Sequence, residues 1–197
     1  MRRFAMLAAL SLTLAVVSNG QIVFQVTAAK DGSVWCATDK GAVHIDADGS
    51  ARTYDKSSGL NDDRVMQVIL DTDGTPWFLH SGAYTSGRSQ TFFANGVSHL
   101  KKDRTVEILT YSKGLPSGFV FAMVFLPDGT KWFATNLGAV RRKADGTFEV
   151  FGADKGLPSS DVRTIFVDPS GATWFGTDAG LAKMDRQGKI TTAYPKP

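Results

Sequence analysis

Three histidines and a single cysteine carry the strongest metal-binding and catalytic chemistry in this 197-residue sequence: His44, His80, His99 and Cys36. The histidines do not have the close spacing that holds zinc, and the cysteine has no second cysteine to pair with. No serine lies in a nucleophile-elbow motif, and no glycine-rich phosphate loop precedes a helix. The sequence therefore predicts no catalytic residues, no metal site and no cofactor.

A polar and aromatic stretch offers binding chemistry instead. Residues Gly82–Asn95 read GAYTSGRSQTFFAN and supply two kinds of contact, aromatic rings and a guanidinium group. The predicted ligand contacts are Tyr84, Arg88, Phe92 and Phe93. The alternative is a long hairpin loop that packs on itself, with turn-forming polar residues around it.

A second candidate is a column of cations and imidazoles. His44, His99, Arg141 and Lys183 align when 13 inserted residues are removed around Gly82–Asn95. Such a column could hold an anion or respond to acid through its two histidines. Alternatively, the side-chain stems pack along the sheet while the polar heads reach water.

These residues are positioned by a phrase that occurs four times. The copies read DGSVWCATDKG, DGTPWFLHSG, DGTKWFATNLG and SGATWFGTDAG, and each places one tryptophan in register. The tryptophans are 42, 55 and 42 residues apart, and the longer interval holds the insertion. A second phrase, SGLNDDRV, KGLPSGFV or KGLPSSDV, lies between the copies. Repeats of this length indicate a propeller or a solenoid. We expect the tryptophans (Trp35, Trp77, Trp132 and Trp174) to pack between repeats rather than to stack a ligand.

Each repeat reads as four short strands separated by Gly, Pro, Asp and Ser. In the third copy the expected strands are 120–126, 131–136, 139–144 and 148–152. We therefore predict an all-β fold, a β-propeller of four four-stranded antiparallel blades at about 21–55, 63–111, 118–152 and 160–194. Open edges at Ile22–Ala28 and Ile190–Tyr194 would invite pairing with another chain. A closed ring, an open arc and a dimer that completes a larger ring are all compatible with the pattern.

Antiparallel geometry determines which loops share a face. In a four-stranded blade, the loop between the second and third strands emerges on the same side as the blade-to-blade loop. The insertion, the T-x-x-G turns and the GLP loops should therefore share one face, and converging loops commonly bind ligands. The T-x-x-G turns would add Asp39, Asn136 and Asp178 to the predicted site.

The combined GLP and Trp pattern, clearest at Gly114–Arg141 and Gly156–Lys183, resembles the two-component-regulator propeller repeat. That family forms periplasmic β-propeller sensor domains of hybrid histidine kinases, so the resemblance implies ligand sensing without chemistry. The Trp phrase is also similar, more weakly, to that of virginiamycin B lyase propellers. This second resemblance implies an enzyme with a histidine base near a metal-held substrate, and His80 is the residue for that role.

The N-terminus resembles a secretory signal peptide. Arg2 and Arg3 precede an apolar run from Phe4 to Val17, which is short for a transmembrane helix of ~20 residues. We predict a signal peptide over 1–20 and one propeller domain over 21–197, in the periplasm or outside the cell. An uncleaved membrane anchor is the alternative. Without the two arginines the formal charge falls from +3 to +1. A nearly neutral domain gives no electrostatic reason to expect binding to nucleic acid or to an anionic membrane.

The sequence thus favours an exported binding module. We expect its partner to be a small ligand, a glycan or a protein, and a homodimer through open blade edges is possible. We expect no nucleic-acid partner and no membrane span after signal cleavage. A lyase-like or hydrolase-like propeller enzyme and a purely structural interaction module are the alternatives.

Overall fold

The computed structural model describes residues 20–86 and 89–195, without the side chains of residues 81–93. Residues 1–19 of the predicted signal peptide and Arg88 lie outside this part. Within it, no helix has the length and apolar character needed to cross a membrane.

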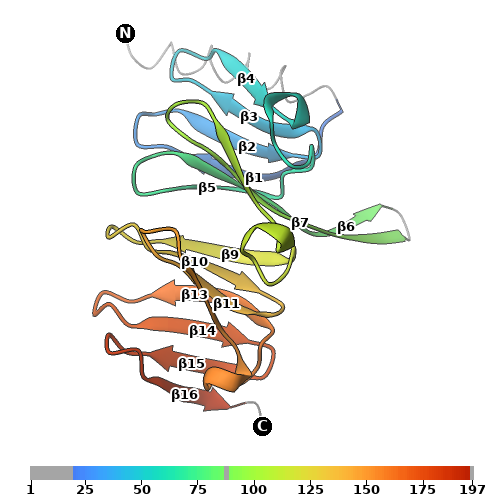
Figure 1. Ribbon diagram of the computed structural model, residues 1–197. Coiled ribbons are helices and arrows are strands. Elements are labelled where there is room, and N and C mark those ends of the chain that lie inside the picture. The colour runs from blue at the N-terminus through green and yellow to red at the C-terminus, as the bar shows by residue number, and fades with distance from the viewer. Residues whose placement is uncertain (1–19, 87–88, 196–197) are drawn as a thin grey trace. The chain divides into compact units, whose positions relative to one another are not determined.

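Sixteen strands form four four-stranded sheets, each in sequence order. This arrangement confirms the predicted all-β fold of four antiparallel blades (Figure 1). In the third copy of the repeat, the strand limits agree with the expected ones to within two residues. Blade 1 contains β1 (Val23–Ala28), β2 (Val34–Thr38), β3 (Gly41–Ile45) and β4 (Ala51–Tyr54); blade 2 contains β5 (Gln67–Leu70), β6 (Pro76–Ser86), β7 (Ser89–Leu100) and β8 (Val106–Leu109); blade 3 contains β9 (Val120–Phe125), β10 (Lys131–Thr135), β11 (Gly138–Arg142) and β12 (Phe148–Phe151); blade 4 contains β13 (Val162–Val167), β14 (Thr173–Thr177), β15 (Gly180–Met184) and β16 (Ile190–Pro195).

The chain divides into two compact units. The first runs to His80 and includes Val97–Ile108, so it holds blade 1 and most of blade 2. The second holds Ser81–Gly96 and everything from Leu109 onward, including blades 3 and 4. That residues 21–197 form one propeller domain stays a prediction.

The tryptophan of one blade packs on the phenylalanine of the next blade inside each unit. Trp35 meets Phe78 at a centroid distance of 5.6 Å, and Trp132 meets Phe175 edge-on at 5.3 Å. Successive strand residues point to opposite faces, so the Trp of a Trp-Phe pair faces the following blade and the Phe faces the preceding one. For these two tryptophans, the predicted packing between blades is confirmed.

Cys36 stands where the other repeats have this phenylalanine. It is buried, and it packs with Val43 and Ile45 on the side of blade 1 away from Trp35. Burial raises the pKa of its thiol. The expectation of a small core residue at this position is confirmed.

Each GLP loop follows the end of a short helix and places a leucine in the core. A short 3-10 helix, η3 (Ala153–Lys155), ends at Gly156 with φ of +94°, which suits glycine because it lacks a Cβ atom. Leu157 follows and is buried between blades 3 and 4. The other two loops repeat this plan, with η1 (Lys56–Ser58) before Leu60 and η2 (Tyr111–Lys113) before Leu115.

The T-x-x-G turns are held by their threonine. In blade 3, Thr135 Oγ1 donates to the carbonyl of Gly138 at 2.7 Å and accepts from the backbone N–H of Leu137 at 3.1 Å. Thr38 and Thr177 make the same bonds in their own blades. In blade 2, His80 takes the place of this threonine, and the tight turn is absent.

We expect Thr135→Val to lower the free energy of unfolding by about 1–3 kcal/mol, because a buried carbonyl and an N–H group lose their partner. Urea unfolding followed by far-UV circular dichroism measures this loss. Thr192→Val, at an exposed position of β16, is the matched control and should change little. Equal losses in the two variants would contradict this role of the hydroxyl.

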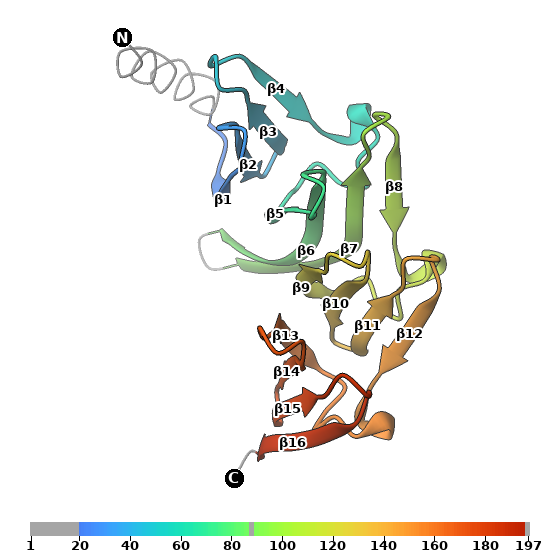
Figure 2. The ribbon, with the colours of Figure 1, turned by 90° about the vertical axis from the view of Figure 1, so that its left-hand side faces the viewer.

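The insertion extends a hairpin instead of forming a loop. β6 continues to Ser86 and β7 begins at Ser89, so most of Gly82–Asn95 is strand (Figure 2). This corrects the expected loop between the second and third strands of blade 2. The physical reason is local: the Tyr, Thr and Phe residues of this stretch favour strands, and continued pairing satisfies their backbone groups.

Candidate functional site

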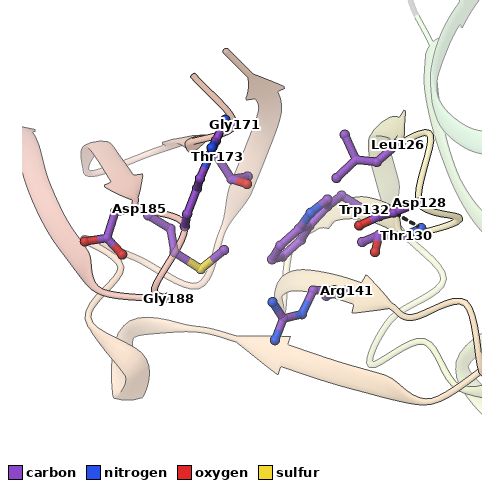
Figure 3. Close-up of a pocket in the computed structure, with 11 residues that line it drawn as sticks. Leu126, Asp128, Thr130, Trp132, Arg141, Gly171, Thr173, Asp185 and Gly188 are labelled. Atoms are coloured by element: carbon purple, nitrogen blue, oxygen red, sulfur yellow. Dashed lines mark hydrogen bonds between the residues drawn. The ribbon is translucent and has the colours of Figure 1, made fainter. Parts of the chain in front are cut away.

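A pocket of about 200 Å³ opens between blades 3 and 4. Side chains from both blades surround it, and Trp132 and Arg141 lie on one side with Thr173 and Asp185 on the other (Figure 3). The turns β9–β10, β13–β14 and β15–β16 form its mouth. Its lining residues are Leu126, Asp128, Thr130, Trp132, Arg141, Gly171, Thr173, Met184, Asp185, Arg186 and Gly188.

The floor of this pocket is apolar and buried. Trp132 on β10 is only 1% exposed, and Met184 on β15 is also buried. Both side chains belong to the core cluster shared by blades 3 and 4. Thr173, buried on β14, adds a hydroxyl group beside them. A floor built on inter-blade packing gives a bound molecule a preformed surface.

Carboxylates stand at the mouth of the pocket. Asp128 Oδ1 accepts from the N–H of Thr130 at 2.8 Å, and Asp185 Oδ1 accepts from the N–H groups of Gln187 and Lys189 at 3.0 and 2.8 Å. In both turns an aspartate side chain accepts hydrogen bonds from backbone N–H groups two or four residues further on, as is typical of aspartates in tight turns. Turn formation therefore fixes where the two carboxylates sit.

Two guanidinium groups balance the carboxylates. Arg141 lies 5.6 Å from the centroid of Trp132 and 5.2 Å from that of Phe151, and it donates to Glu149 Oε2. That hydrogen bond lowers the pKa of Glu149, so this pair stays ionised to lower pH than a free glutamate would. The side chain of Arg186, in contrast, is exposed and passes over the bare Cα of Gly171, where a Cβ would lie 2.7 Å from its Nε.

The pocket combines acceptors, donors and an apolar floor within a small volume. Carboxylates accept hydrogen bonds, guanidinium groups donate them, and a threonine hydroxyl does both. The volume is below the roughly 300–1,000 Å³ of pockets for drug-sized ligands. The arrangement suits a small, hydroxyl-rich molecule with one apolar face, of about the size of a monosaccharide.

The cation column packs on the repeat tryptophans. His44 stacks on Trp35 with a centroid distance of 4.2 Å, and Lys183 lies 5.0 Å from the ring of Trp174. In register, each is the direct cross-strand partner of its tryptophan. His99 on Trp77 and Arg141 on Trp132 repeat the arrangement. The alternative of packing along the blade is therefore the one observed. In three of the four pairs, the nine-residue spacing across a tight turn was the signal that could have revealed the contact; in blade 2 the insertion lengthens this spacing to 22 residues.

A second hollow, of about 300 Å³, lies at the equivalent turns of blade 2. Asp73 and Thr75 hold the positions of Asp128 and Thr130, and Thr75 Oγ1 lies 2.9 Å from His99 Nε2. An ion pair of 3.4 Å joins Lys102 to Asp73 at its rim. Both hollows lie at the Asp-Gly turns, on the side of each blade opposite the T-x-x-G and GLP loops where the site was expected. Sequence reasoning missed them because it assigned these turns to structure alone.

The predicted loop residues have mainly structural contacts where they are described. Asp39 Oδ1 accepts from the N–H of Ile22 at 2.8 Å, which ties the T-x-x-G turn to the start of β1. Asp178 is exposed, and its N–H donates to the carbonyl of Asp161. Asn136 is half-buried, and its Oδ1 is buried without a hydrogen-bond partner in the described part. Within the part of the chain that the structure describes, no hydrogen bond joins Asn136 to Asp178.

The other predicted contacts fall on the β6–β7 hairpin. Tyr84 lies on β6, and Phe92 and Phe93 lie on β7, but their side chains are outside the described part, as is all of Arg88. Their role in binding stays a prediction.

His80, the base that a lyase would need, is fully buried. Its Nδ1 lies 2.9 Å from the carbonyl of Arg64, and its Nε2 lies 2.9 Å from Ser98 Oγ. Since the carbonyl can only accept, Nδ1 carries the proton and Nε2 accepts from the hydroxyl. Ser98 Oγ in turn accepts from the N–H of Asn61 at 3.0 Å. His80 thus fastens the blade 1–blade 2 loop to β6 and β7.

Blade 4 contains, within one repeat, a GLP turn, a buried leucine and a strand that carries the repeat tryptophan. Residues 156–179 match the two component regulator propeller. For the last copy of the repeat, this match confirms the predicted resemblance to the two-component-regulator propeller repeat. No curated protein matches the sequence significantly.

Solved structures similar to this chain share the propeller fold. One is described as the extracellular domain of a hybrid two component system, BT3049 of B. thetaiotaomicron, with a TM-score of 0.70 and 23% identity over 88% of this chain and 23% of that one. Virginiamycin B lyase from Staphylococcus aureus has a TM-score of 0.63 and 20% identity over 86% of this chain and 54% of the lyase. The gluconolactonase XC5397 from Xanthomonas campestris has a TM-score of 0.52 and 18% identity, over 87% and 61%. The chain thus spans about a quarter of the first structure and half of the second, and at these identities the likeness concerns the fold.

Proposed function

We propose that this chain is an exported binding module that holds a small, hydroxyl-rich ligand, such as a monosaccharide unit, without chemical change. The observation that carries the proposal is the pocket between blades 3 and 4. Its buried floor, with Trp132 and Met184, and its rim, with Asp128, Asp185 and Arg186, supply apolar contact and hydrogen bonds in one place. The hairpin residues Tyr84, Arg88, Phe92 and Phe93 form a second proposed contact surface.

Binding fits the contacts of the described residues better than catalysis by His80 does. A general acid or base needs a titratable group whose proton can reach the substrate. His80 is enclosed by its hydrogen bonds to Arg64 and Ser98, and burial lowers its pKa. Arg141 is engaged with Glu149 and two aromatic rings, which suits a positioning role.

A sensor-like role and export are parts of the same proposal. They rest on the predicted signal peptide, on the regulator propeller repeat at residues 156–179 and on the similar extracellular domain of a two component system. In such a role, ligand occupancy would be passed to a partner protein in the periplasm or at the cell surface.

We expect Arg186→Gln to weaken sugar binding at least about tenfold, because the substitution removes the charged guanidinium donors that would bond the sugar hydroxyl groups. The residue is exposed, so the fold should be retained. The measurement is isothermal titration calorimetry with a panel of neutral monosaccharides and uronic acids, guided by thermal-shift screening. Lys30→Gln, which removes an exposed cation far from this pocket in sequence and blade, is the matched control. Sugar binding that is unchanged by Arg186→Gln, Asp128→Asn and Asp185→Asn would contradict this site.

A further inference from the structure

Thr173 is a buried threonine that faces the pocket between blades 3 and 4. It lies on β14, is 4% exposed, and directs its side chain into the hollow (Figure 3). Its cross-strand partner on β15 is Met184, which also lines the pocket. Within the part of the chain that the structure describes, the Thr173 hydroxyl group forms no hydrogen bond with the protein. Such a group needs an explanation, because nearly all buried polar groups in proteins are bonded.

The fold does not require a hydroxyl group at this position. The equivalent residue of blade 1 is Val34, which pairs with an isoleucine on the next strand just as Thr173 pairs with Met184. Val34 packs against the apolar cluster of its own blade. Pro76 and Lys131 take the position in blades 2 and 3. A valine would fill the place of Thr173 with the same shape, so the hydroxyl group is not what builds the strand.

Thr130, which lines the pocket from blade 3, also has an uncommitted hydroxyl group. In the equivalent turn of blade 2, Thr75 donates from its N–H and from its hydroxyl group to Asp73 Oδ1, at 3.0 and 2.6 Å. Ser33 of blade 1 bonds its own aspartate in the same two ways. Thr130 gives only its N–H to Asp128, and within the described residues its hydroxyl group forms no other hydrogen bond. Each blade thus presents one uncommitted hydroxyl group to the same pocket.

A neutral hydroxyl group of a ligand suits the buried end of this pocket better than an anion does. A hydroxyl group both donates and accepts, so it can pair with a threonine in either direction. A carboxylate would need a cation beside it, because a buried charge without a partner is costly. Arg141, the cation that lies over the ring of Trp132, is already paired with Glu149, and Arg186 is exposed.

We propose that Thr173 is a specificity-determining contact for a neutral sugar, one of whose hydroxyl groups enters the pocket and bonds the Thr173 hydroxyl group. This inference rests on the proposed binding function and names the class of ligand and the group of the ligand that is recognised. Asp128, Asp185 and Arg186 then bond the sugar hydroxyl groups that stay at the mouth. A site built around such a bond discriminates against a ligand that lacks the hydroxyl group, because a buried polar group of the protein is left unpaired.

The test is isothermal titration calorimetry with the best neutral sugar of the panel and each of its monodeoxy analogues. Thr173→Val should weaken binding of the parent sugar about tenfold or more, whereas Thr173→Ser, which keeps the hydroxyl group, should stay within about threefold. One monodeoxy analogue should show a similar loss with the unaltered protein and no further loss with Thr173→Val, because the two changes remove the same bond. Losses that simply add would overturn the inference. Thr192→Val, at an exposed position outside the pocket, is the control and should leave sugar binding unchanged.

Stability in the absence of sugar supplies a second readout. Because the hydroxyl group has no bond to the protein, Thr173→Val should not lower the urea midpoint of unfolding, in contrast to Thr135→Val. A lower midpoint would assign the hydroxyl group to the fold and overturn the inference. Binding confined to uronic acids, or sugar binding that is weakened by Arg186→Gln but unchanged by Thr173→Val, would overturn this inference alone. If no sugar of the panel binds, or if binding is unchanged by Arg186→Gln, Asp128→Asn and Asp185→Asn, the proposed function fails as well.

Discussion

Trp132→Ala should lower the free energy of unfolding by about 3–5 kcal/mol. The indole is 1% exposed and packs on Phe151 within its blade and on Phe175 across the blade interface. Alanine would leave a cavity under both rings and remove the surface on which Arg141 lies. Urea unfolding monitored by circular dichroism measures the effect.

Trp174→Ala is the matched control, because Trp174 occupies the same place in blade 4 but is less buried than Trp132. Its ring is half-buried. The indole N–H donates a hydrogen bond to Asp168 Oδ2 at 2.9 Å, and Lys183 lies over the face of the ring. We expect a loss of roughly 1–2 kcal/mol at a concentration where the protein is monomeric. Similar losses at Trp132 and Trp174 would contradict the view that inter-blade packing sets the role of the repeated tryptophan.

His80→Asn should lower the free energy of unfolding by about 2–3 kcal/mol at neutral pH. The asparagine amide can still donate to the carbonyl of Arg64, but it leaves Ser98 Oγ without its acceptor and a buried space unfilled. His44→Asn is the control, since His44 is partly exposed and stacks on one face of Trp35. The free energies of unfolding of both variants test the difference.

Acid should remove part of the stability that His80 provides. Burial lowers its pKa in the folded protein, although the Arg64 carbonyl and the carboxylates of Asp62 and Asp63 oppose this. The folded state therefore keeps His80 neutral at a pH where the unfolded chain binds a proton. The contribution is complete above the unfolded pKa of about 6.5 and declines, by at most about 1.4 kcal/mol per pH unit, as the pH falls toward the folded value.

The stability of the unaltered chain should consequently fall more steeply below pH 6.5 than that of His80→Asn. Denaturant unfolding at a series of pH values checks the slope. Parallel profiles for the two proteins would show that His80 is not held neutral by burial.

The repeat pattern predicted the architecture well because each of its residues has a local physical task. The Asp-Gly turns, the Trp-Phe strands and the glycine of the GLP loop specify a turn, an inter-blade contact and a helix end within about forty residues. Strand limits such as those of β10 could be predicted for that reason. The insertion could not, because an interrupted repeat carries no register, and the strand-forming residues of Gly82–Asn95 extended the hairpin instead.

The candidate site was predicted less well. The expected residues Asp39, Asn136 and Asp178 were chosen for polarity and for their shared face, and the structure shows the side chain of Asp39 tied to the start of β1. The pocket, in contrast, depends on the distance between the turns of neighbouring blades. Asp128, Asp185 and Arg186 look like ordinary turn residues in the sequence, and only the packing of blade 3 on blade 4 brings them around one hollow.

The measurement that tests the central claim most directly uses the four tryptophan indole N–H signals as reporters in nuclear magnetic resonance. The signals are assigned by single Trp→Phe variants, and the best sugar from the panel is titrated into the protein. The account predicts that the Trp132 signal moves in a saturable way while those of Trp35 and Trp174 stay in place, and that the sugar spectrum is unchanged after prolonged incubation. A fixed Trp132 signal with shifts confined to the hairpin of Gly82–Asn95, or the appearance of product signals, would contradict binding without chemistry in this pocket.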